Sequence, residues 1–466
     1  MPPSGRSSDT ALPLRGFFAT KAQQGLSSLS DRRSGAFGPL ARKAMSLSVL
    51  TALGQASFVI ALPVLSRLYT PSDFGIFTIY LSIVNIGGPI VGLKFESAIF
   101  AAQSKREASV TLALSVLTTI VMSSAAAALL WAFAPHVAEL LSPAARWMLW
   151  YLPFGLFLAG MWAVSSAWAI KAEATSVLGV ARFAQPAAMT ALQLVGGFVL
   201  PASGVVLIGA HLVSHLLYSS FVFLRTLTRD ELSNFAPGRW SAILRHAKTH
   251  RGFPLFVLPA QISYLGVSNL PPLLLSLFYG AEIAGHCGVA YRLVAAPVTI
   301  ASLALGAIFT GIASRTRDHQ VVVPLARKVF LANLLFVSIP ILLLGATAPA
   351  IAPAVLGSHW AITGQFVAAF ALIGAAQSLS APFAETTSIF RSQALRFGIE
   401  FVPAALVVTS IFFGGLSYWP PLHTIWLMSI SGAGASLVGL ALLWRRLPAM
   451  IRRAAPEACS GERRER

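Results

Sequence analysis

The sequence predicts an all-α polytopic membrane protein with about twelve transmembrane helices, arranged as two six-helix lobes related by a parallel internal repeat. Three observations predict this fold: the composition, the apolar segments, and the distribution of lysine and arginine. The 466 residues are 56% hydrophobic and only 11% charged, whereas soluble domains carry about 25% charged residues. Such a chain cannot surround itself with charge, so most of it must face lipid.

Apolar segments long enough to cross a bilayer recur between residues 44 and 444. The predicted spans are 44–66, 74–93, 109–131, 147–169, 177–200, 203–224, 253–278, 286–312, 327–347, 362–383, 399–416 and 420–444. The connections on the predicted outer side are short, which leaves no room for a catalytic domain outside the membrane.

Lysine and arginine are distributed very unequally between the two sides of this arrangement. If the connections alternate between the sides, 31 of the 34 Lys and Arg residues lie on one side, and only Arg67, Arg146 and Arg292 lie on the other. Because these residues favour the cytoplasmic side, both termini are predicted to be cytoplasmic and the number of spans to be even. The net charge of +18 then indicates contact with anionic membrane lipids, and nucleic-acid binding is not expected.

The spans fall into two groups of six, separated by one charged segment. The predicted regions are a disordered basic cytoplasmic tail (1–43), an N-terminal lobe (44–224), a cytoplasmic linker (225–252), a C-terminal lobe (253–444) and a basic cytoplasmic tail (445–466). LPVLSRLYTPSDFG (62–75) resembles PPLLLSLFYGAEIAG (271–285). The shared position and predicted side of these segments indicate a parallel duplication about an axis normal to the membrane.

Four charged residues at or within spans are candidate site residues, because a charge in lipid is costly. Arg67 ends the first span, and Arg292 lies about two turns into the eighth, on the side that has few Lys and Arg. Both suit a cationic cavity for a substrate with phosphate groups, although a fixed salt bridge with Glu282 is the alternative for Arg292. Lys94 and Glu96 end the second span and fit either the membrane interface or the cavity.

His211 and His215 stand one turn apart in the sixth span. They fit hydrogen bonds between helices, with proton coupling as the alternative. No carboxylate accompanies them in HLVSH and no zinc-binding cysteine spacing occurs, so neither a metal site nor a cofactor is predicted. The sequence also lacks a P-loop, a GxSxG motif and paired acids on an outer loop, so an enzyme is not expected.

Five segments carry a family resemblance: ALPVLSRLYTPSDFGIFTIY (61–80), KFESAIFAA (94–102), LGVARFAQPAAMTALQL (178–194), FPLFVLPAQISYLGVSNLPPLLLSLFYG (253–280) and YRLVAAPVTIASLALGAIF (291–309). With the layout of six plus six spans, they resemble the Wzx-type polysaccharide flippases of the MOP (multidrug, oligosaccharidyl-lipid, polysaccharide) exporter superfamily. The resemblance covers residues 44–444.

The resemblance implies that an undecaprenyl-diphosphate-linked oligosaccharide crosses the bacterial inner membrane by alternating access, for O-antigen, capsule or exopolysaccharide synthesis. A polysaccharide polymerase and export machinery are the partners that it implies. Arg67 and Arg292 would line the cavity, with Lys94 and Glu96 next. One alternative is a cation-coupled drug exporter of the same superfamily, which would need acids buried in mid-span. Another is a membrane-embedded glycosyltransferase or ligase, which would need acids or histidines on a long outer loop.

Overall fold

The computed structural model describes residues 38–136, 143–228, 231, 240–316, 319–383, 387 and 393–454. In these ranges the chain consists of helices joined by turns, and no strand occurs. The chain divides into two units, residues 1–45 and 46–466, and the second unit contains the helical bundle. Residues 1–37 and 455–466, which belong to the two predicted tails, lie outside the described residues.

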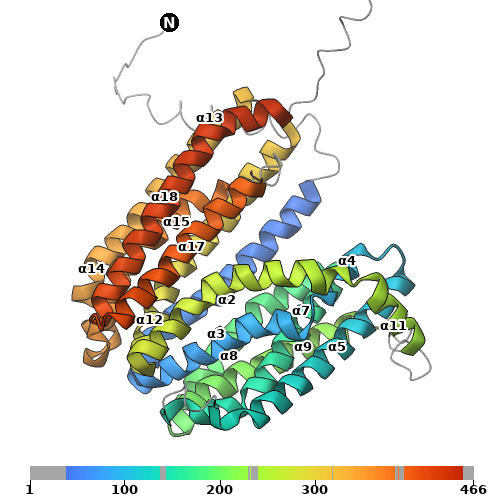
Figure 1. The fold of residues 1–466 in the computed structure, drawn as a ribbon, viewed down its shortest axis with the longest axis horizontal. Helices are drawn as coiled ribbons and strands as arrows, with labels where there is room; N and C mark the ends of the chain where they lie inside the picture. Colours follow the sequence, from blue (N-terminus) through green and yellow to red (C-terminus); the bar gives the residue numbers. More distant parts are fainter. Residues whose placement is uncertain are drawn as a thin grey trace, which may run out of the picture. The chain divides into compact units, whose positions relative to one another are not determined.

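The first half of the described chain contains a long helix at each of the six predicted spans (Figure 1). They are α2 (Gly38–Leu68), α3 (Pro71–Val91), α5 (Lys105–Ala132), α7 (Leu152–Lys171), α8 (Thr175–Val199) and α9 (Gly204–Thr226). The short α4 (Phe95–Ala101) follows α3, and a 3₁₀ segment, η1 (Pro143–Trp150), precedes α7.

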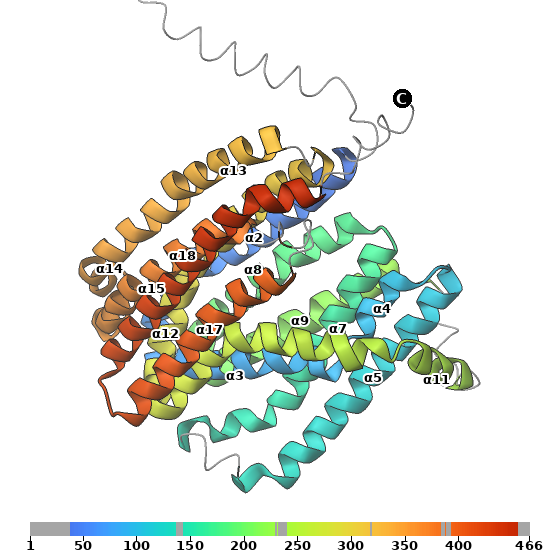
Figure 2. The same ribbon diagram turned by 45° about the horizontal axis from the view of Figure 1, so that its top comes forward.

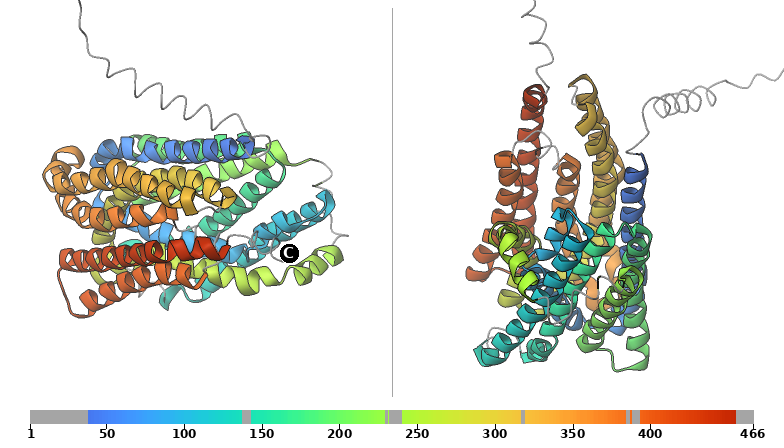
Figure 3. Two further views of the ribbon diagram at one scale, coloured as in Figure 1. Left: turned by 90° about the horizontal axis from the view of Figure 1, so that it is seen from above. Right: turned by 90° about the vertical axis from the view of Figure 1, so that its right-hand side faces the viewer.

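The second half begins with the linker helix α11 (Trp240–Thr249) and the π-helical turn η4 (Phe253–Val257). The remaining elements are α12 (Leu258–Thr316), α13 (His319–Asn333), η5 (Leu334–Ser338), α14 (Ile339–Leu356), η6 (Ser358–Trp360), α15 (Ala361–Ser380), η7 (Ala381–Phe383), α17 (Gln393–Leu416) and α18 (Pro421–Ala454). The last two lie side by side (Figures 2 and 3).

The element α12 is two helical arms, because Gly280 interrupts it with φ +83°. Glycine adopts this left-handed backbone without the Cβ clash that other residues meet. The arms, 258–279 and 281–316, leave the bend in different directions (Figure 1). They correspond to the seventh and eighth predicted spans.

The start of α3 is fixed by a capping box. Asp73 N donates to Thr70 Oγ1 at 3.2 Å, and Thr70 N donates to Asp73 Oδ2 at 3.1 Å. Pro71 occupies the first helical turn, where it suits the fixed φ of proline. The second oxygen, Asp73 Oδ1, accepts from Gly204 N at 2.8 Å, so one carboxylate ties the start of α3 to the start of α9.

Ten segments of the described chain are long and apolar enough to cross a bilayer, which makes the protein a multi-pass membrane protein. The helix α8 is not among the ten, and it carries the polar residues Arg182, Gln185 and Gln193. One segment, Asn269–Thr299, includes parts of both arms of α12. Helices therefore occupy every predicted span, while the count of twelve stays a prediction.

The buried cores distinguish two ends of the helices. We call the end where α2 stops, α12 bends and η6 lies the Gly280 end, and the opposite end, with α4 and α11, the linker end. At the Gly280 end one core contains residues of both halves, such as Phe74, Ala281 and Trp360. At the linker end the cores around Phe309 and around Trp168 contain only second-half and only first-half residues, respectively. The core shared by the long helices of both halves lies at the Gly280 end, whereas at the linker end α11 contributes Ile243 to a core with Val110 of α5.

Candidate functional site

At the Gly280 end, α3 and the second arm of α12 meet backbone to backbone. A Cβ atom on Gly75 would collide with the carbonyl oxygen of Ala281, and a Cβ atom on Gly285 would collide with that of Pro71. Only glycine allows this approach. The two contacts are reciprocal, because Pro71 and Gly75 match Ala281 and Gly285 in the predicted repeat. A twofold axis between two repeats would produce this pattern.

Trp360 fills the interface beside these glycines. Its side chain is 1% exposed, and its indole N–H donates to the carbonyl oxygen of Ser66 at 2.8 Å. Its ring meets Phe74 and His286 edge to face, each with ring centroids 5.4 Å apart. Since Ser66 and Phe74 belong to the first half and His286 to the second, packed side chains close the Gly280 end.

Glu282, the acid that was the alternative partner of Arg292, lies near His286 instead. His286 Nδ1 lies 2.7 Å from Thr363 Oγ1, and His286 Nε2 lies 4.0 Å from Glu282 Oε1. Among the described residues, no ion pair joins Glu282 to Arg292. The structure thus offers no support for the salt-bridge interpretation of Arg292.

Arg292 lies farther along the same arm, about 10 Å beyond Gly285 by helical rise. The central carbon of its guanidinium is 4.9 Å from the ring centroid of Phe58 and 5.2 Å from that of Phe77. Both rings belong to the first half, so the side chain reaches across the interface. Within the described part of the chain, its guanidinium has no hydrogen-bond or carboxylate partner, and ring faces supply the compensating negative potential. Its N–H donors therefore remain available to an anion.

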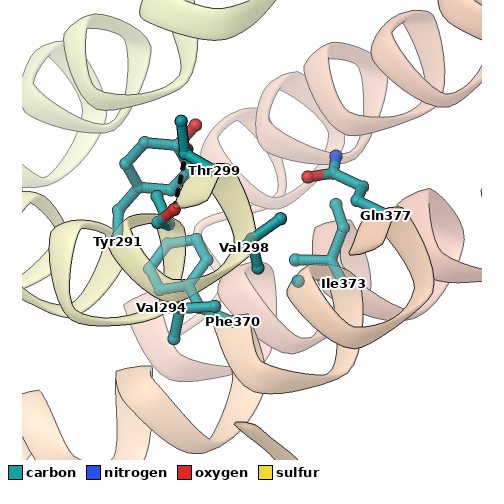
Figure 4. Close-up of a pocket in the computed structure, with 9 residues that line it drawn as sticks. Tyr291, Val294, Val298, Thr299, Phe370, Ile373 and Gln377 are labelled. Carbon is teal, nitrogen blue, oxygen red and sulfur yellow. Dashed lines mark hydrogen bonds between the residues drawn. The ribbon is translucent and has the colours of Figure 1, made fainter. Parts of the chain in front are cut away.

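A cavity of about 120 Å³ lies between α15 and the arm that carries Arg292. Figure 4 shows Tyr291, Val294 and Thr299 on the wall from α12, and Phe370, Ile373 and Gln377 on the wall from α15. The Thr299 hydroxyl donates to the carbonyl oxygen of Ala295 at 2.8 Å. The cavity is mostly apolar with a few polar groups, and its volume is below the range of about 300–1,000 Å³ that is typical of small-molecule sites.

Lys94 and Glu96 lie at the linker end. They form an ion pair with Nζ and Oε1 3.0 Å apart, and Glu96 is 5% exposed. Lys94 adopts a left-handed backbone (φ +58°) where α3 gives way to α4. Because α3 rises roughly 20 Å between Phe77 and Val91, this pair does not share a site with Arg292.

Arg67 is placed apart from the other candidates as well. Its side chain is exposed at the last turn of α2. No contact joins it to Arg292 among the described residues, so the structure does not bring the two predicted cavity arginines together.

His211 and His215 belong to a buried network that joins three helices. His211 Nδ1 lies 3.2 Å from the Tyr80 hydroxyl of α3, and the ring also meets Phe77 edge to face. His215 Nδ1 lies 3.1 Å from both His211 O and Gln185 Nε2, and its tautomer decides which bond forms. The network therefore has the form of hydrogen bonds between helices.

Phe77 is the residue at which the arginine and the histidines meet. It contacts both Arg292 and His211. Neither Phe77 nor Phe58 could be selected from the sequence, because phenylalanine is common in membrane helices and its position does not show which partner it meets. The site thus places a cation against aromatic rings at the interface between the two halves. The Gly280 end, which is the end nearest to the site, is closed.

Comparison with known proteins agrees with this arrangement. A family model described as polysaccharide biosynthesis protein matches residues 64–363. No curated protein is significantly similar in sequence.

The chain is similar in structure to a lipid II flippase MurJ in an inward closed conformation, with 12% identity, 90% of each chain covered and a TM-score of 0.65. It is also similar to an inward-facing multidrug resistance MATE family transporter of the MOP superfamily, with 15% identity, 88% and 96% covered and a TM-score of 0.54. An outward-facing MATE family transporter matches with 12% identity, 91% and 100% covered and a TM-score of 0.55.

At such identities these structures show the fold, and the family model shows the family. The expected family and the expected fold are thereby confirmed. The chain belongs to the polysaccharide biosynthesis protein family and has the fold of MOP-superfamily transporters.

Proposed function

We propose that the protein is a flippase that moves an undecaprenyl-diphosphate-linked oligosaccharide across the bacterial inner membrane for surface polysaccharide synthesis. The observation that carries this proposal is the guanidinium of Arg292, which lies between the two halves without a carboxylate partner among the described residues. A diphosphate is the part of such a substrate that a guanidinium can bind with two parallel hydrogen bonds. Membership of the family and the transporter fold support the proposal.

The direction of transport follows from the predicted orientation. Because 31 of 34 Lys and Arg residues lie on the predicted cytoplasmic side, we assign the linker end to the cytoplasm. The Gly280 end is then periplasmic, and the closed packing around Trp360 corresponds to an inward-facing state. The two halves, taken as six-helix lobes, would rock about the site so that each end opens in turn. A polymerase in the periplasm would then receive the oligosaccharide.

Substrate binding and movement would be coupled through the aromatic rings. In the closed state, Phe58 and Phe77 compensate the charge of Arg292. Opening of the Gly280 end separates the halves and removes those rings from the arginine. A bound diphosphate replaces the lost interaction with a stronger, charge-assisted one, and so it favours the state that releases the substrate outward.

Replacement of Arg292 tests the proposal. We expect Arg292→Ala to abolish export of surface polysaccharide in cells that lack the native gene, and Arg292→Lys to retain part of it, because lysine keeps the charge but not the bidentate geometry. A matched control is Arg225→Ala, since Arg225 also lies over a phenylalanine ring, at 5.8 Å from Phe221, but at the exposed end of α9.

Surface polysaccharide is measured together with the membrane level of each variant. Near-normal export by an Arg292→Ala protein of normal abundance would exclude this residue from the substrate site. Equal loss in Arg225→Ala and Arg292→Ala would point to a general effect of removing a ring-bound arginine.

A further inference from the structure

Three potential metal ligands lie close together outside the predicted membrane spans, on the linker helix α11 and at the start of α5. They are Glu107, His246 and His250, and one ligand atom of each lies within 4.8 Å of the other two. Figure 2 shows α11 beside α5 at this place. The sequence alone predicted no metal site, because the glutamate is far from the two histidines in the chain.

The packing of α11 explains why both histidines face α5. Ile243 is buried in a core with Val110 of α5, and Ala247 packs against the same core. Residues three or four positions later lie on the same face of a helix. His246 and His250 therefore continue this face, toward the first turn of α5.

The carboxylate of Glu107 is already oriented toward the histidines. Its Oε2 accepts from Gln103 N at 2.7 Å, and its backbone N–H donates to Ser104 Oγ at 3.1 Å, so the residue is held at the helix start. Its other oxygen, Oε1, lies 3.9 Å from His250 Nε2, which is too long for a hydrogen bond.

The histidine nitrogens provide an independent observation. His246 Nδ1 and His250 Nε2 are buried and have no hydrogen-bond partner among the described residues. The side chain of His250 is only 11% exposed. Buried nitrogens without a partner are costly, and a metal ion is a ligand that satisfies both of them together with the carboxylate.

We propose that Glu107, His246 and His250 bind a zinc ion that fastens the linker helix α11 to α5. Two imidazoles and one carboxylate form a common protein ligand set for Zn²⁺, with a fourth position for water. Ligand atoms around tetrahedral zinc lie about 3.3 Å apart, as bonds of roughly 2.0–2.1 Å require. The 3.9 Å between Glu107 Oε1 and His250 Nε2 would shorten toward this value when the ion binds.

The electrostatic surroundings agree with ligation by neutral imidazole. Burial lowers the pKa of His246, nearby His250 and Arg245 lower it further, and Glu107 acts in the opposite direction. Arg245 and Lys248 are exposed on another face of the same helix. The fastening matters because His250 lies three residues before the start of η4, which leads into α12. Zinc would therefore fix the entrance to α12 against the first half.

Zinc binding is measurable without any transport assay. The full-length protein, purified in detergent without a histidine tag and stripped with EDTA, is titrated with Zn²⁺ in competition with a chromogenic indicator. We expect one saturable site, and at least about tenfold weaker binding in His250→Ala and in Glu107→Gln. His359→Ala is the matched control, because His359 is exposed at the Gly280 end, and its binding should equal that of the wild type.

A second readout reports on the fastening itself. Bound Zn²⁺ should slow cleavage by trypsin after Lys248 in the wild type and not in Glu107→Gln, a variant that keeps the shape and the helix cap of Glu107. The absence of saturable binding by the wild type would overturn the proposal. Binding that is unchanged in both His250→Ala and Glu107→Gln would overturn it equally.

Discussion

The two ends of the helical bundle are built from different chemistry. At the Gly280 end the halves touch through glycine backbone and buried rings, and one core belongs to both. At the linker end the described residues include the ion pair of Lys94 and Glu96, the histidines of α11 and separate cores for each half. The Gly280 end is thus a mainly apolar joint between the halves, whereas the linker end carries charged and polar groups, including Glu107 of α5 beside His250 of the linker segment.

This difference shows how such a joint can open. A contact made of apolar surface and glycine exposes few unpaired polar groups when it separates. When the packing around Trp360 separates, its indole N–H is the donor that loses its partner, Ser66 O, and a typical hydrogen bond contributes only about 1 kcal/mol net. A salt bridge buried at this place would cost several kcal/mol to break. The Gly280 end is therefore suited to repeated opening.

The first test of this comparison is the orientation of the two ends in the membrane. We expect reporters fused after Gly238 and after Pro448 to be cytoplasmic, and one fused near Pro135 to be periplasmic, an all-or-none difference that follows from the distribution of Lys and Arg. Paired alkaline phosphatase and fluorescent-protein fusions measure it. A cytoplasmic signal near Pro135 would reverse our assignment of the Gly280 end to the periplasm.

Trp360 tests how much the shared core stabilises the protein. Trp360→Ala leaves a cavity between the halves and should lower the free energy of unfolding by about 3–5 kcal/mol, as for other buried aromatic residues. Trp131→Ala is the control, because Trp131 is 75% exposed. Thermal unfolding in detergent compares the two. Equal stability of both variants would show that Trp360 does not hold the halves together.

The paired glycines test whether the joint needs backbone contact. Gly285→Ala and Gly75→Ala each place a methyl group against a carbonyl oxygen, and overpacking of this kind costs about 1–3 kcal/mol. The equilibrium should shift away from the closed Gly280 end by roughly fivefold to a hundredfold, since each 1.4 kcal/mol is a factor of ten.

This shift can be measured as faster labelling of a Ser66→Cys variant, lacking the native cysteines, by a membrane-impermeant maleimide. Gly209→Ala is the matched control, because a Cβ there meets nothing within 4 Å. Labelling that is the same in all three glycine variants would contradict the role of backbone contact.

The sequence was most informative where the physical signal is local. Long apolar runs predicted the positions of the helices, and the scarcity of positive charge on one side distinguished Arg292. Partners across the interface depend on tertiary packing, so neither Phe77 nor the contact of Gly75 with Ala281 could be inferred, although the repeat containing Gly75 was visible. Arg67 shows the reverse case. Its charge marked it as a candidate, yet the last turn of α2 leaves its side chain exposed.

The histidine pair provides the smallest expected effect and separates packing from proton coupling. His211 is 4% exposed and pairs with the Tyr80 hydroxyl at 3.2 Å. A glutamine amide can still hydrogen-bond with that hydroxyl, so His211→Gln should retain most polysaccharide export and lose at most about 1 kcal/mol of stability. His211→Leu leaves the hydroxyl without this partner and should cost about 1–3 kcal/mol. Complete loss of export by His211→Gln at normal membrane abundance, with stability unchanged, would instead assign the histidine to proton coupling, because an amide cannot titrate.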